Sequence, residues 1–457
     1  MTSSHPIPPA AGPGLSPEPD PVGDLATRRR NFGLGVANGA VFQGGDSFID
    51  SSTVLPVLLS GLTRSNALIG FAAGLSDMGW FLPQMFVAPW ASRRARQMRL
   101  YHVTAVVRSL GVLLIAALAW PLRQRPAEML AVFFVGYSVY CVVAGVGGVA
   151  FMEIVGRTVP PGRLGSFFSQ RMFWGGLAAA FAGLGVREVL KIDEDALHFV
   201  ILFGLASVIT GIAYGLFGAV REPALPASPT PDTPLALLRQ GMRWLRHDAL
   251  FRRLFLARAS QSVWLAGSPF MVLFAVRELG GGGRAAGTFL LARTAGFVLS
   301  NLLWHELSRR RGNREIMRVA TAAECLLLVS AAIVAALSPW ALGLISAHAG
   351  VLAFEGIAGL GGAAYCGITV GFNALVIEMA PAGNRQSFVS LMSTFLGPTL
   401  LLPALGGAIA DATNAPVLFA LCGVTGLVGF RAAAGLPARR GGEAVLASPP
   451  LGGSISG

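Results

Sequence analysis

Long apolar segments recur along almost the whole of this sequence, and they restrict its fold more than any other feature. Each segment has about 18 or more residues, which is enough for a helix to cross a hydrocarbon core about 30 Å thick. Only 13% of the residues are charged, whereas soluble domains average about 25%. The sequence therefore predicts an all-α polytopic membrane protein.

Charged residues and Pro/Gly breaks divide the apolar sequence into twelve predicted spans. The spans cover residues 32–60, 66–91, 100–121, 127–150, 165–188, 196–219, 250–276, 285–307, 317–338, 346–371, 387–410 and 414–434. Because this number is even, both termini lie on one side of the membrane. Most of the 35 Lys and Arg residues fall in the tails and in the loops on that side, and positively charged loops stay in the cytoplasm. Both termini are therefore predicted to be cytoplasmic.

The longest connection between apolar runs divides the chain into two halves of six spans. It covers residues 221–249, with a Pro-rich start and then the basic amphipathic stretch "LALLRQGMRWLRHDALFRRL", which is predicted to lie on the membrane surface. Residues 1–24 contain no basic segment followed by an apolar one, so no cleavable signal peptide is expected. The predicted organisation is a disordered cytoplasmic tail (1–30), an N-terminal six-helix bundle (31–220), a cytoplasmic linker with an amphipathic helix (221–249), a C-terminal six-helix bundle (250–434) and a second disordered cytoplasmic tail (435–457).

Two pairs of loop sequences indicate that the halves are copies of one unit. After the fourth span the chain reads "PPGRLGSFFS" (160–169), and after the tenth it reads "PAGNRQSFVS" (381–390), at an offset of 221 residues. The stretches "ASRRARQM" (91–98) and "LSRRRGNR" (307–314) match at an offset of 216. Similar offsets at equivalent places predict a parallel repeat, which is the construction of two-bundle transporters.

In these features the chain resembles the major facilitator superfamily, from Asn31 to about Arg431. The resemblance implies twelve transmembrane helices in two pseudo-symmetric six-helix bundles. It also implies a secondary active transporter that moves a small solute by alternating access, without a cofactor and without enzymatic activity. Exporters of this family carry a Gly/Pro-rich signature in span 5, and span 11 here, "LGPTLLLPALGGAIAD", is similar to it. The resemblance thus points to efflux, and close helix packing is the alternative explanation of the same Gly and Pro residues.

The basic loop motif of the family, which follows span 2 and recurs after span 8, is partly kept. The second copy, "HELSRRRGNRE", has Arg310, Gly312 and Arg314 at matching positions, and the first copy, "PWASRRARQMR", has Arg94. The resemblance implies that these four residues act at the bundle interface or in gating. Both copies have Arg where the family has an acidic residue that helps to latch the bundles. Span 4 also lacks the Arg of proton-coupled members, so the resemblance gives no support for proton coupling.

Charged residues inside the spans mark the candidate site, because a charge in lipid is costly and must face the protein interior or a water-filled cavity. In "GGDSFIDSS" two carboxylates lie one helical turn apart and so share a face. The fold that the chain resembles places the first helix of each three-helix unit against a central cavity. The predicted substrate or coupling-ion residues are Asp46, Asp50, Gln43, Arg258, Gln261 and Glu355. Buried structural pairing is the alternative interpretation of the same residues.

Other charged residues inside the spans are interpreted as structural. Asp77, Arg171 and Arg293 are predicted to form ion pairs or polar contacts at the seam between the bundles, with a role at the interface or in gating. Glu324 belongs to a span that the resemblance places at the periphery. Arg108 is expected to snorkel toward the cytoplasm, with its long apolar stem inside the membrane.

The sequence contains no phosphate-binding loop, nucleophile elbow or His/Cys metal-binding cluster, so ATP hydrolysis and a membrane enzyme are not supported. The net charge of +12 comes from short clusters without interleaved aromatic residues, which argues against a nucleic-acid partner. The leading hypothesis is a monomeric secondary carrier of a small solute in a bacterial inner membrane. Protons are the expected coupling ion, because buried carboxylates can bind them. A transport-inactive sensor or membrane partner protein with the same fold is the alternative.

Overall fold

The computed structural model describes residues 24–91, 94–160, 163–223, 234–379, 391–392 and 395–437, and the regular secondary structure in these ranges is helical. Most of both predicted tails lies outside the described residues. The first helix begins at Leu25, earlier than the predicted tail 1–30 implies, because the Asp24 side chain caps it. The backbone N–H of Thr27 donates a hydrogen bond to Asp24 Oδ1 at 3.1 Å, and this bonding lowers the pKa of the Asp24 carboxyl.

The described N-terminal half consists of seven helices, which account for the first six predicted spans. They are α1 (Leu25–Ser47), α2 (Val54–Ser60), α3 (Asn66–Ala91), α4 (Met98–Ala119), α5 (Pro126–Thr158), α6 (Leu164–Val189) and α7 (Asp195–Gly218). One continuous helix is expected over residues 32–60, but the chain leaves the helix after Ser47 and enters a second one at Val54. The first span is therefore broken near its middle.

The described C-terminal half begins with α8 (Pro234–His247), which is amphipathic and contacts α9. The helices that follow it are α9 (Ala249–Arg277), α10 (Ala285–Arg311), α11 (Asn313–Leu337), α12 (Ala347–Met379), η2 (Gly397–Leu401), α14 (Leu402–Ala412) and α15 (Ala415–Ala434). The short 3₁₀ helix η2 and α14 belong to the eleventh predicted span, the first part of which lies outside the described residues.

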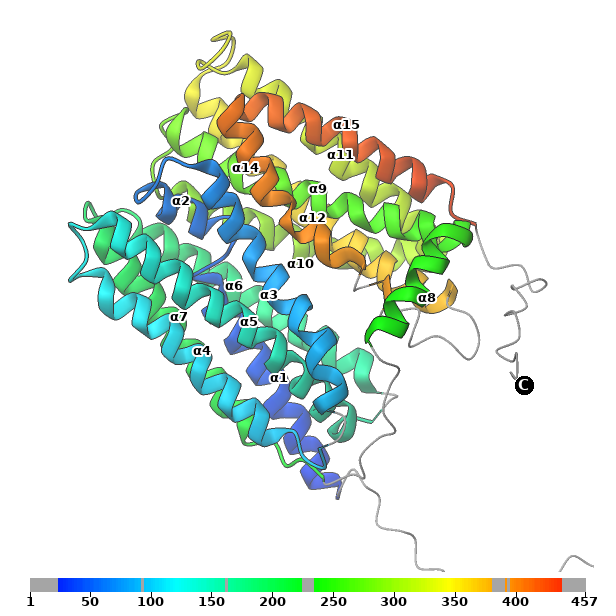
Figure 1. Ribbon diagram of the computed structural model, residues 1–457. Coiled ribbons are helices and arrows are strands. Elements are labelled where there is room, and N and C mark those ends of the chain that lie inside the picture. The colour runs from blue at the N-terminus through cyan, green and yellow to red at the C-terminus, as the bar shows by residue number, and fades with distance from the viewer. Residues whose placement is uncertain are drawn as a thin grey trace, which may run out of the picture.

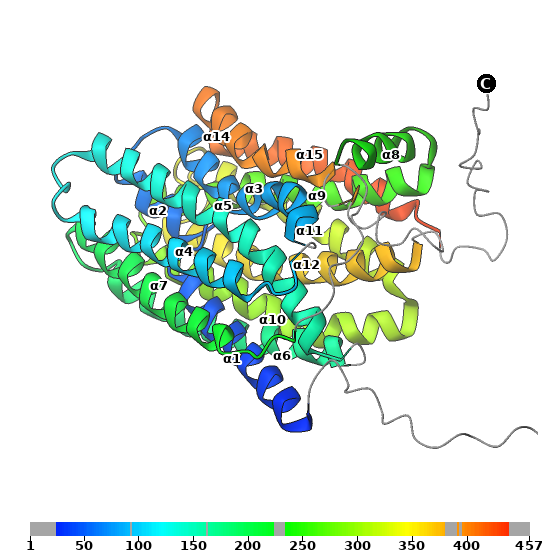
Figure 2. The same ribbon diagram turned by 60° about the horizontal axis from the view of Figure 1, so that its bottom comes forward.

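Helix pairings repeat from one half to the other, which makes two bundles of the same construction (Figure 1). In the N-terminal bundle α1 packs against α6 and α7, α4 packs against α5 and α7, and α3 packs against α5. In the C-terminal bundle the equivalent helices pair in the same way, with α9 against α14 and α15, α11 against α12 and α15, and α10 against α12. The bundles meet at two seams, α6 with α10 and α3 with α14, and Figure 2 shows the first of these seams from another side.

Eight helices in the described part of the chain are long and apolar enough to cross a membrane. They are α4, α5, α7, α9, α10, α11, α12 and α15. The other four predicted spans correspond to α1 with α2, to α3, to α6 and to η2 with α14. Each of these four packs along at least one of the eight. The described structure therefore contains a segment for each of the twelve predicted spans.

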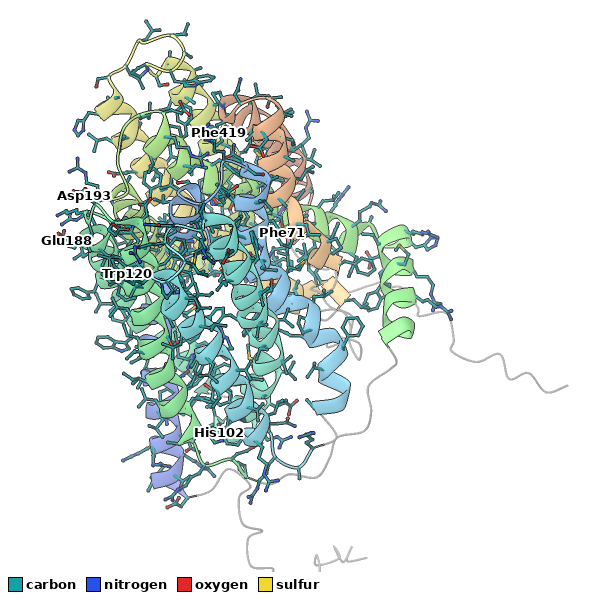
Figure 3. All side chains as sticks on the ribbon, turned by 60° about the vertical axis from the view of Figure 1, so that its left-hand side comes forward. Phe71, His102, Trp120, Glu188, Asp193 and Phe419 are labelled. Atoms are coloured by element: carbon teal, nitrogen blue, oxygen red, sulfur yellow. The ribbon has the colours of Figure 1, made fainter. Side chains whose placement is uncertain are left out.

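The start of α1 and the end of α15 lie at one end of the molecule, the terminal end, on the same side as α8 (Figure 1). In Figure 3, His102 lies near the terminal end of α4, whereas Trp120, Glu188 and Asp193 lie at the opposite end. Loops that the sequence assigns to different sides of the membrane are thus separated in the structure.

Small residues allow the bundles to approach closely along both seams. A Cβ atom on Gly70 of α3 would lie 2.0 Å from the carbonyl oxygen of Pro403 in the α14 segment. A Cβ atom on Gly287 of α10 would lie 2.5 Å from the carbonyl oxygen of Gly183 in α6. Both glycines lie near the helix starts at the opposite end, so the bundles are held together most tightly there.

Candidate solute site

Two adjoining cavities lie between the bundles. The larger cavity has a volume of about 500 Å³ and the smaller cavity about 420 Å³. They share five lining residues, Phe42, Asp46, Asp77, Leu265 and Tyr365. Both are lined from the two bundles, so the charged residues of α1 and α9 face a common interior space. A space of this size is typical of a small-molecule site.

Asp50 lies at the break in the first span and joins the two bundles. Its Oδ1 atom accepts hydrogen bonds from the backbone N–H and hydroxyl groups of Ser52, at 3.0 and 2.8 Å, and of Thr53, at 2.9 and 2.8 Å. Its Oδ2 atom forms an ion pair with Arg293 of α10. The carboxylate therefore satisfies the turn that precedes α2, as a helix-capping residue does, and also binds a cation of the other bundle. The two aspartates do not share a continuous helix face, although both line the larger cavity.

Asp46 belongs to a polar group of α1, α4 and α5 that borders the smaller cavity. The Tyr140 hydroxyl donates a hydrogen bond of 2.6 Å to Asp46 Oδ1. The guanidinium of Arg108 lies over the Tyr140 ring, 4.2 Å from its centroid, and over the rings of Phe42 and Tyr214 at 5.4 Å. Arg108 is only 8% exposed, so the expectation that it snorkels to the cytoplasm is wrong. Cation–π contacts and a nearby carboxylate hold its charge in the interior.

Gln43 and Arg171 also line the larger cavity. Arg171 of α6 donates hydrogen bonds to the carbonyl of Gly35 and to Asn38 Oδ1, the latter at 2.8 Å. Its guanidinium also lies 4.7 Å from the centroid of the Phe151 ring. These partners all belong to the N-terminal bundle, so Arg171 ties α6 to α1 while bordering the cavity.

Asp77 of α3 lines both cavities. In the described part of the chain no hydrogen bond or ion pair reaches its carboxylate. An acidic side chain without a protein partner in a cavity wall is available to a cationic group or to water.

Arg258 lines the smaller cavity from the C-terminal bundle. Its guanidinium lies 5.2 Å from the centroid of the Phe372 ring, and its charge interacts with Tyr365, Glu324 and Asp77. Glu324 of α11 is 2% exposed, and neither of its carboxylate oxygens has a hydrogen-bond partner. Glu324 belongs to a span that is expected at the periphery, but its side chain points into the bundle.

For two of the predicted site residues the structure gives no contact with either cavity. Glu355 of α12 accepts a hydrogen bond of 2.5 Å from the Thr288 hydroxyl of α10 and does not line either cavity. Gln261 belongs to α9, but its side chain lies outside the described part of the structure. Whether either residue contacts a solute stays a prediction.

The residues of the basic loop motif lie at the terminal end. Arg310 pairs with Glu306 on its own helix, and Arg314 donates a hydrogen bond of 3.2 Å to the carbonyl of Ala434 in α15. Gly312 has a φ of 83° and separates α10 from α11, a conformation that favours glycine. The backbone carbonyl of Arg94 accepts a hydrogen bond of 3.4 Å from Arg157. The gating role that the resemblance implies for these four residues stays a prediction.

The opposite end is closed by contacts that the sequence analysis did not identify. Asp411 of α14 accepts hydrogen bonds from the backbone N–H groups of Asn66 and Ala67, both at 2.9 Å, and so caps α3 of the other bundle. Arg277 of α9 donates to Asn66 Oδ1 at 3.1 Å and to the carbonyl of Thr63 at 3.3 Å. Among the described residues, side-chain hydrogen bonds between the bundles occur only here, at Ser65 and at the Asp50–Arg293 pair.

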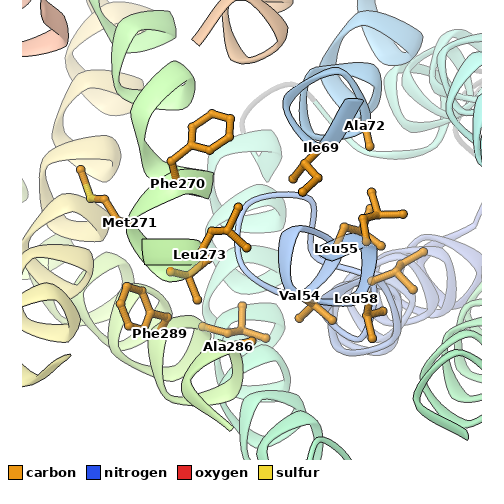
Figure 4. Packing of buried hydrophobic residues seen from close by; sticks show 14 of the residues in the cluster. Val54, Leu55, Leu58, Ile69, Ala72, Phe270, Met271, Leu273, Ala286 and Phe289 are labelled. Carbon is orange, nitrogen blue, oxygen red and sulfur yellow. The ribbon is translucent and has the colours of Figure 1, made fainter. Parts of the chain in front are cut away.

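An apolar cluster around α2 fills the space between this end and the cavities (Figure 4). Side chains of α2 meet those of α3, α9 and α10 in this cluster. The residues are Val54, Leu55, Leu58, Ile69, Ala72, Phe270, Leu273, Ala286 and Phe289. All of them are almost completely buried, so the cavities have no open path through this part of the molecule.

The described residues contain no group of three or more His, Cys, Asp or Glu side chains placed to hold a metal ion. The four cysteines, Cys141, Cys325, Cys366 and Cys422, are buried and unpaired. The charged groups at the cavities thus form ion pairs, form hydrogen bonds or face the interior space.

Comparisons with solved structures place this fold among membrane transporters. A POT family transporter in complex with a thioalcohol-conjugated peptide has a TM-score of 0.66 at 14% identity, over 87% of this chain and 94% of that chain. A bacterial homologue of the iron transporter ferroportin in its inward-facing state has a TM-score of 0.65 at 16% identity, over 90% and 99% of the two chains. A bacterial homologue of ferroportin in an outward-facing state with soaked iron has a TM-score of 0.57 at 16% identity, over 88% of this chain and 98% of that chain.

No family model matches the sequence, and no curated protein matches it. At these identities the structural likeness establishes the fold alone. With the paired helix contacts of the two halves, it confirms the architecture that the sequence predicts. The chain has the twelve-helix, two-bundle fold of the major facilitator superfamily.

Proposed function

We propose that this protein is a secondary active membrane transporter that moves a small polar solute by alternating access to the cavities between its bundles. The observation that carries the proposal is a charged interior space of two adjoining cavities, lined from both bundles and sealed at one end. Charged side chains inside a membrane protein are costly and mark solute or ion pathways. Location at the interface of two structural repeats is typical of transporter sites.

The conformation supports a two-state cycle. The inter-bundle hydrogen bonds of the described residues all lie on the side of the opposite end. The positive-inside rule assigns the terminal end to the cytoplasm, so the proposed state faces inward. The higher TM-score against the inward-facing homologue, 0.65 compared with 0.57 for the outward-facing one, supports the same assignment. In the outward-facing state the contacts of Asp411, Arg277 and the Asp50–Arg293 pair would have to break.

Within this proposal, the residues at the cavities take different roles. Asp46, Asp77 and Arg258 supply charges to the cavity surface for a solute or a coupling ion, and Gln43 supplies an amide beside them. Asp50 and Arg293 form a gate, because their ion pair joins the bundles and both residues line the larger cavity. Coupling to protons, export as the direction of transport and a bacterial inner membrane location belong to the same proposal.

Accessibility of the cavity tests the proposal without knowledge of the solute. In a background without the four native cysteines, a single cysteine at Gln43 faces the larger cavity. Proteoliposomes of one orientation are treated with a membrane-impermeant maleimide from either side. Alternating access predicts that Gln43→Cys reacts from both sides, and that an additional Asp411→Ala substitution speeds the reaction from the side of the opposite end, because one inter-bundle contact is lost.

The matched control is Leu302→Cys. This side chain is 80% exposed on the outer surface of α10 and does not line a cavity, so it should react from neither side. Reaction of Gln43→Cys from the terminal side alone, with and without Asp411→Ala, would contradict alternating access. That result would favour a carrier-fold protein that no longer transports.

A further inference from the structure

Each bundle pairs an acid with an arginine in its interior, and the two pairs have opposite charge order. Arg108 and Glu324 are buried, whereas Asp46 and Arg258 are half-buried. Arg108 of α4 and Glu324 of α11 differ by 216 residues, which is the offset of the basic loops that precede these helices. The helices are also equivalent by their packing, since α4 contacts α5 and α7 as α11 contacts α12 and α15. The third helix of each bundle thus carries an arginine in one half and a glutamate in the other, at the same position.

The partner of each of these residues lies on the first helix of the same bundle. Arg108 interacts with Asp46 of α1, and Glu324 interacts with Arg258 of α9. A tyrosine of the fourth helix accompanies each pair, Tyr140 in one bundle and Tyr365 in the other. Each tyrosine is followed by a cysteine, which supports their equivalence. The repeat has therefore kept the arrangement and reversed the charges.

The two acids differ in their hydrogen bonds, although neither pair forms a direct ion pair among the described residues and Arg108 Nε has no hydrogen-bond partner. The Asp46 carboxylate receives the Tyr140 hydroxyl, and three aromatic rings surround the Arg108 guanidinium. In the C-terminal pair both oxygens of Glu324 lack a hydrogen-bond donor at 2% exposure. No direct ion pair joins Glu324 to Arg258 among the described residues, although their charges interact. An ionised carboxylate in such a place is costly, whereas a protonated one is much less so.

Arg258, in contrast to Glu324, reaches the smaller cavity. Its position between a buried acid and an open space means that an anion in the cavity would compete with Glu324 for the same cation. A guanidinium binds carboxylates in a fixed geometry with several donors. The open side of Arg258 is therefore suited to a carboxylate group.

Within the proposed transport function, we propose that Arg258 binds a carboxylate group of the solute, and that Glu324 takes up one proton when that carboxylate arrives. Before binding, the charge of Arg258 is balanced by ionised Glu324. After binding it is balanced by the solute carboxylate, while Glu324 carries the proton as a neutral acid. Asp77 also acts on Arg258 and does not change in this exchange, so the net charge around Arg258 is the same in both states. Arg258 and Tyr365 are the charged or titratable groups that act on Glu324; the described residues of α10 and α15 add none.

Binding of small organic carboxylates to the purified full-length protein in nanodiscs tests this assignment. The probes are acetate, benzoate and glycine, with methylammonium as a cation of similar size. The wild-type protein should bind at least one carboxylate probe, and the apparent affinity should rise by up to about tenfold for each unit of decrease in pH, because one proton is linked to one bound anion. A pH-indicator dye in weakly buffered solution should record proton uptake on binding.

Glu324→Gln should keep the binding of the carboxylate probe and lose both its pH dependence and the proton uptake. Arg258→Gln should lose carboxylate binding at every pH. Glu194→Gln, which removes an exposed loop carboxylate at the opposite end, is the matched control and should behave as the wild type. Infrared spectra of the unliganded protein give a second measurement, because the protonated-carboxyl band that titrates with pH should be absent from Glu324→Gln.

Three results would each overturn the proposal. They are the failure of all three carboxylates to bind the wild type, proton uptake that persists in Glu324→Gln, and infrared titrations that are identical in the wild type and Glu324→Gln. The maleimide experiment at Gln43 is independent of anion binding. A protein that shows two-sided access without carboxylate binding would keep the transport function and lose only this assignment.

Discussion

The two bundles contain the same polar arrangement with opposite charges, but the acids of the two differ in their hydrogen bonds. Asp46 accepts a hydrogen bond from Tyr140, and the Tyr140 ring contacts the Arg108 guanidinium. In the C-terminal bundle neither carboxylate oxygen of Glu324 has a hydrogen-bond partner. We therefore expect the N-terminal group to contribute more to stability than its C-terminal counterpart. This difference leads to four predictions about the stability of variants, which are given in order of the expected effect.

The largest effect is expected for Asp46→Asn. The substitution leaves the Arg108 guanidinium buried without a carboxylate, and breaking a buried pair in this way costs about 3–5 kcal/mol. Thermal unfolding of the purified protein, followed by intrinsic fluorescence, should show a large decrease in stability. A decrease no larger than that of an exposed-site control such as Asp193→Asn would mean that the N-terminal pair is not a structural unit.

A smaller loss is expected for Tyr140→Phe. It removes a hydroxyl that donates to a carboxylate, and hydrogen bonds to charged groups contribute about 1.5–3 kcal/mol. The equivalent substitution Tyr365→Phe removes no hydrogen bond that the described structure contains, so its effect should stay within about 0.5 kcal/mol. Equal losses of stability in the two variants, measured by the same unfolding assay, would remove the contrast between the bundles.

The double variant Asp46→Asn with Arg108→Gln is expected to be more stable than Asp46→Asn alone. Removing both charges leaves neither one unpaired, and neutral replacements for a buried pair are often tolerated. The coupling energy in a double-mutant cycle should be about 1–3 kcal/mol. Additive effects of the two substitutions would show that the two charges are independent of each other.

The smallest effect on stability is expected for Glu324→Gln, within about 0.5 kcal/mol or stabilising. The substitution replaces a carboxylate that lacks donors by a neutral amide of similar volume, and Arg258 keeps access to the cavity. Unfolding in the same assay as Asp46→Asn provides the comparison. A loss as large as that of Asp46→Asn would place the C-terminal pair in the same structural class as the N-terminal one.

Much of the architecture is predictable from sequence, because membrane spans are set by length and hydropathy and the repeat is visible in the loops. The twelve segments and the two-bundle fold follow from those features. The break in the first span was missed, although a signal exists, since Asp50 is followed by Ser-Ser-Thr and then by Pro56, and this pattern is typical of a helix start.

The candidate site was harder to predict, because lipid-facing and interior positions of a membrane helix have similar hydrophobicity. Asp46, Asp50 and Arg258 are predicted from their charge and from the cavity-lining helices that the resemblance implies, and Asp77 is predicted as a seam residue. The structure places all four at the cavities. The buried positions of Arg108 and Glu324 depend on helix rotation, which the sequence does not specify. The common offset of 216 residues could have identified them as equivalent, but not as buried.

The apolar cluster around α2 bears on whether protons can pass through the molecule. Protons move along chains of water and polar groups, and a dry constriction interrupts such a chain. Val54, Leu55 and Leu58 are between 0 and 4% exposed in that cluster. A dry barrier of this kind would interrupt a water path between the terminal end and the opposite end, so the conformation described here should not conduct protons across a membrane.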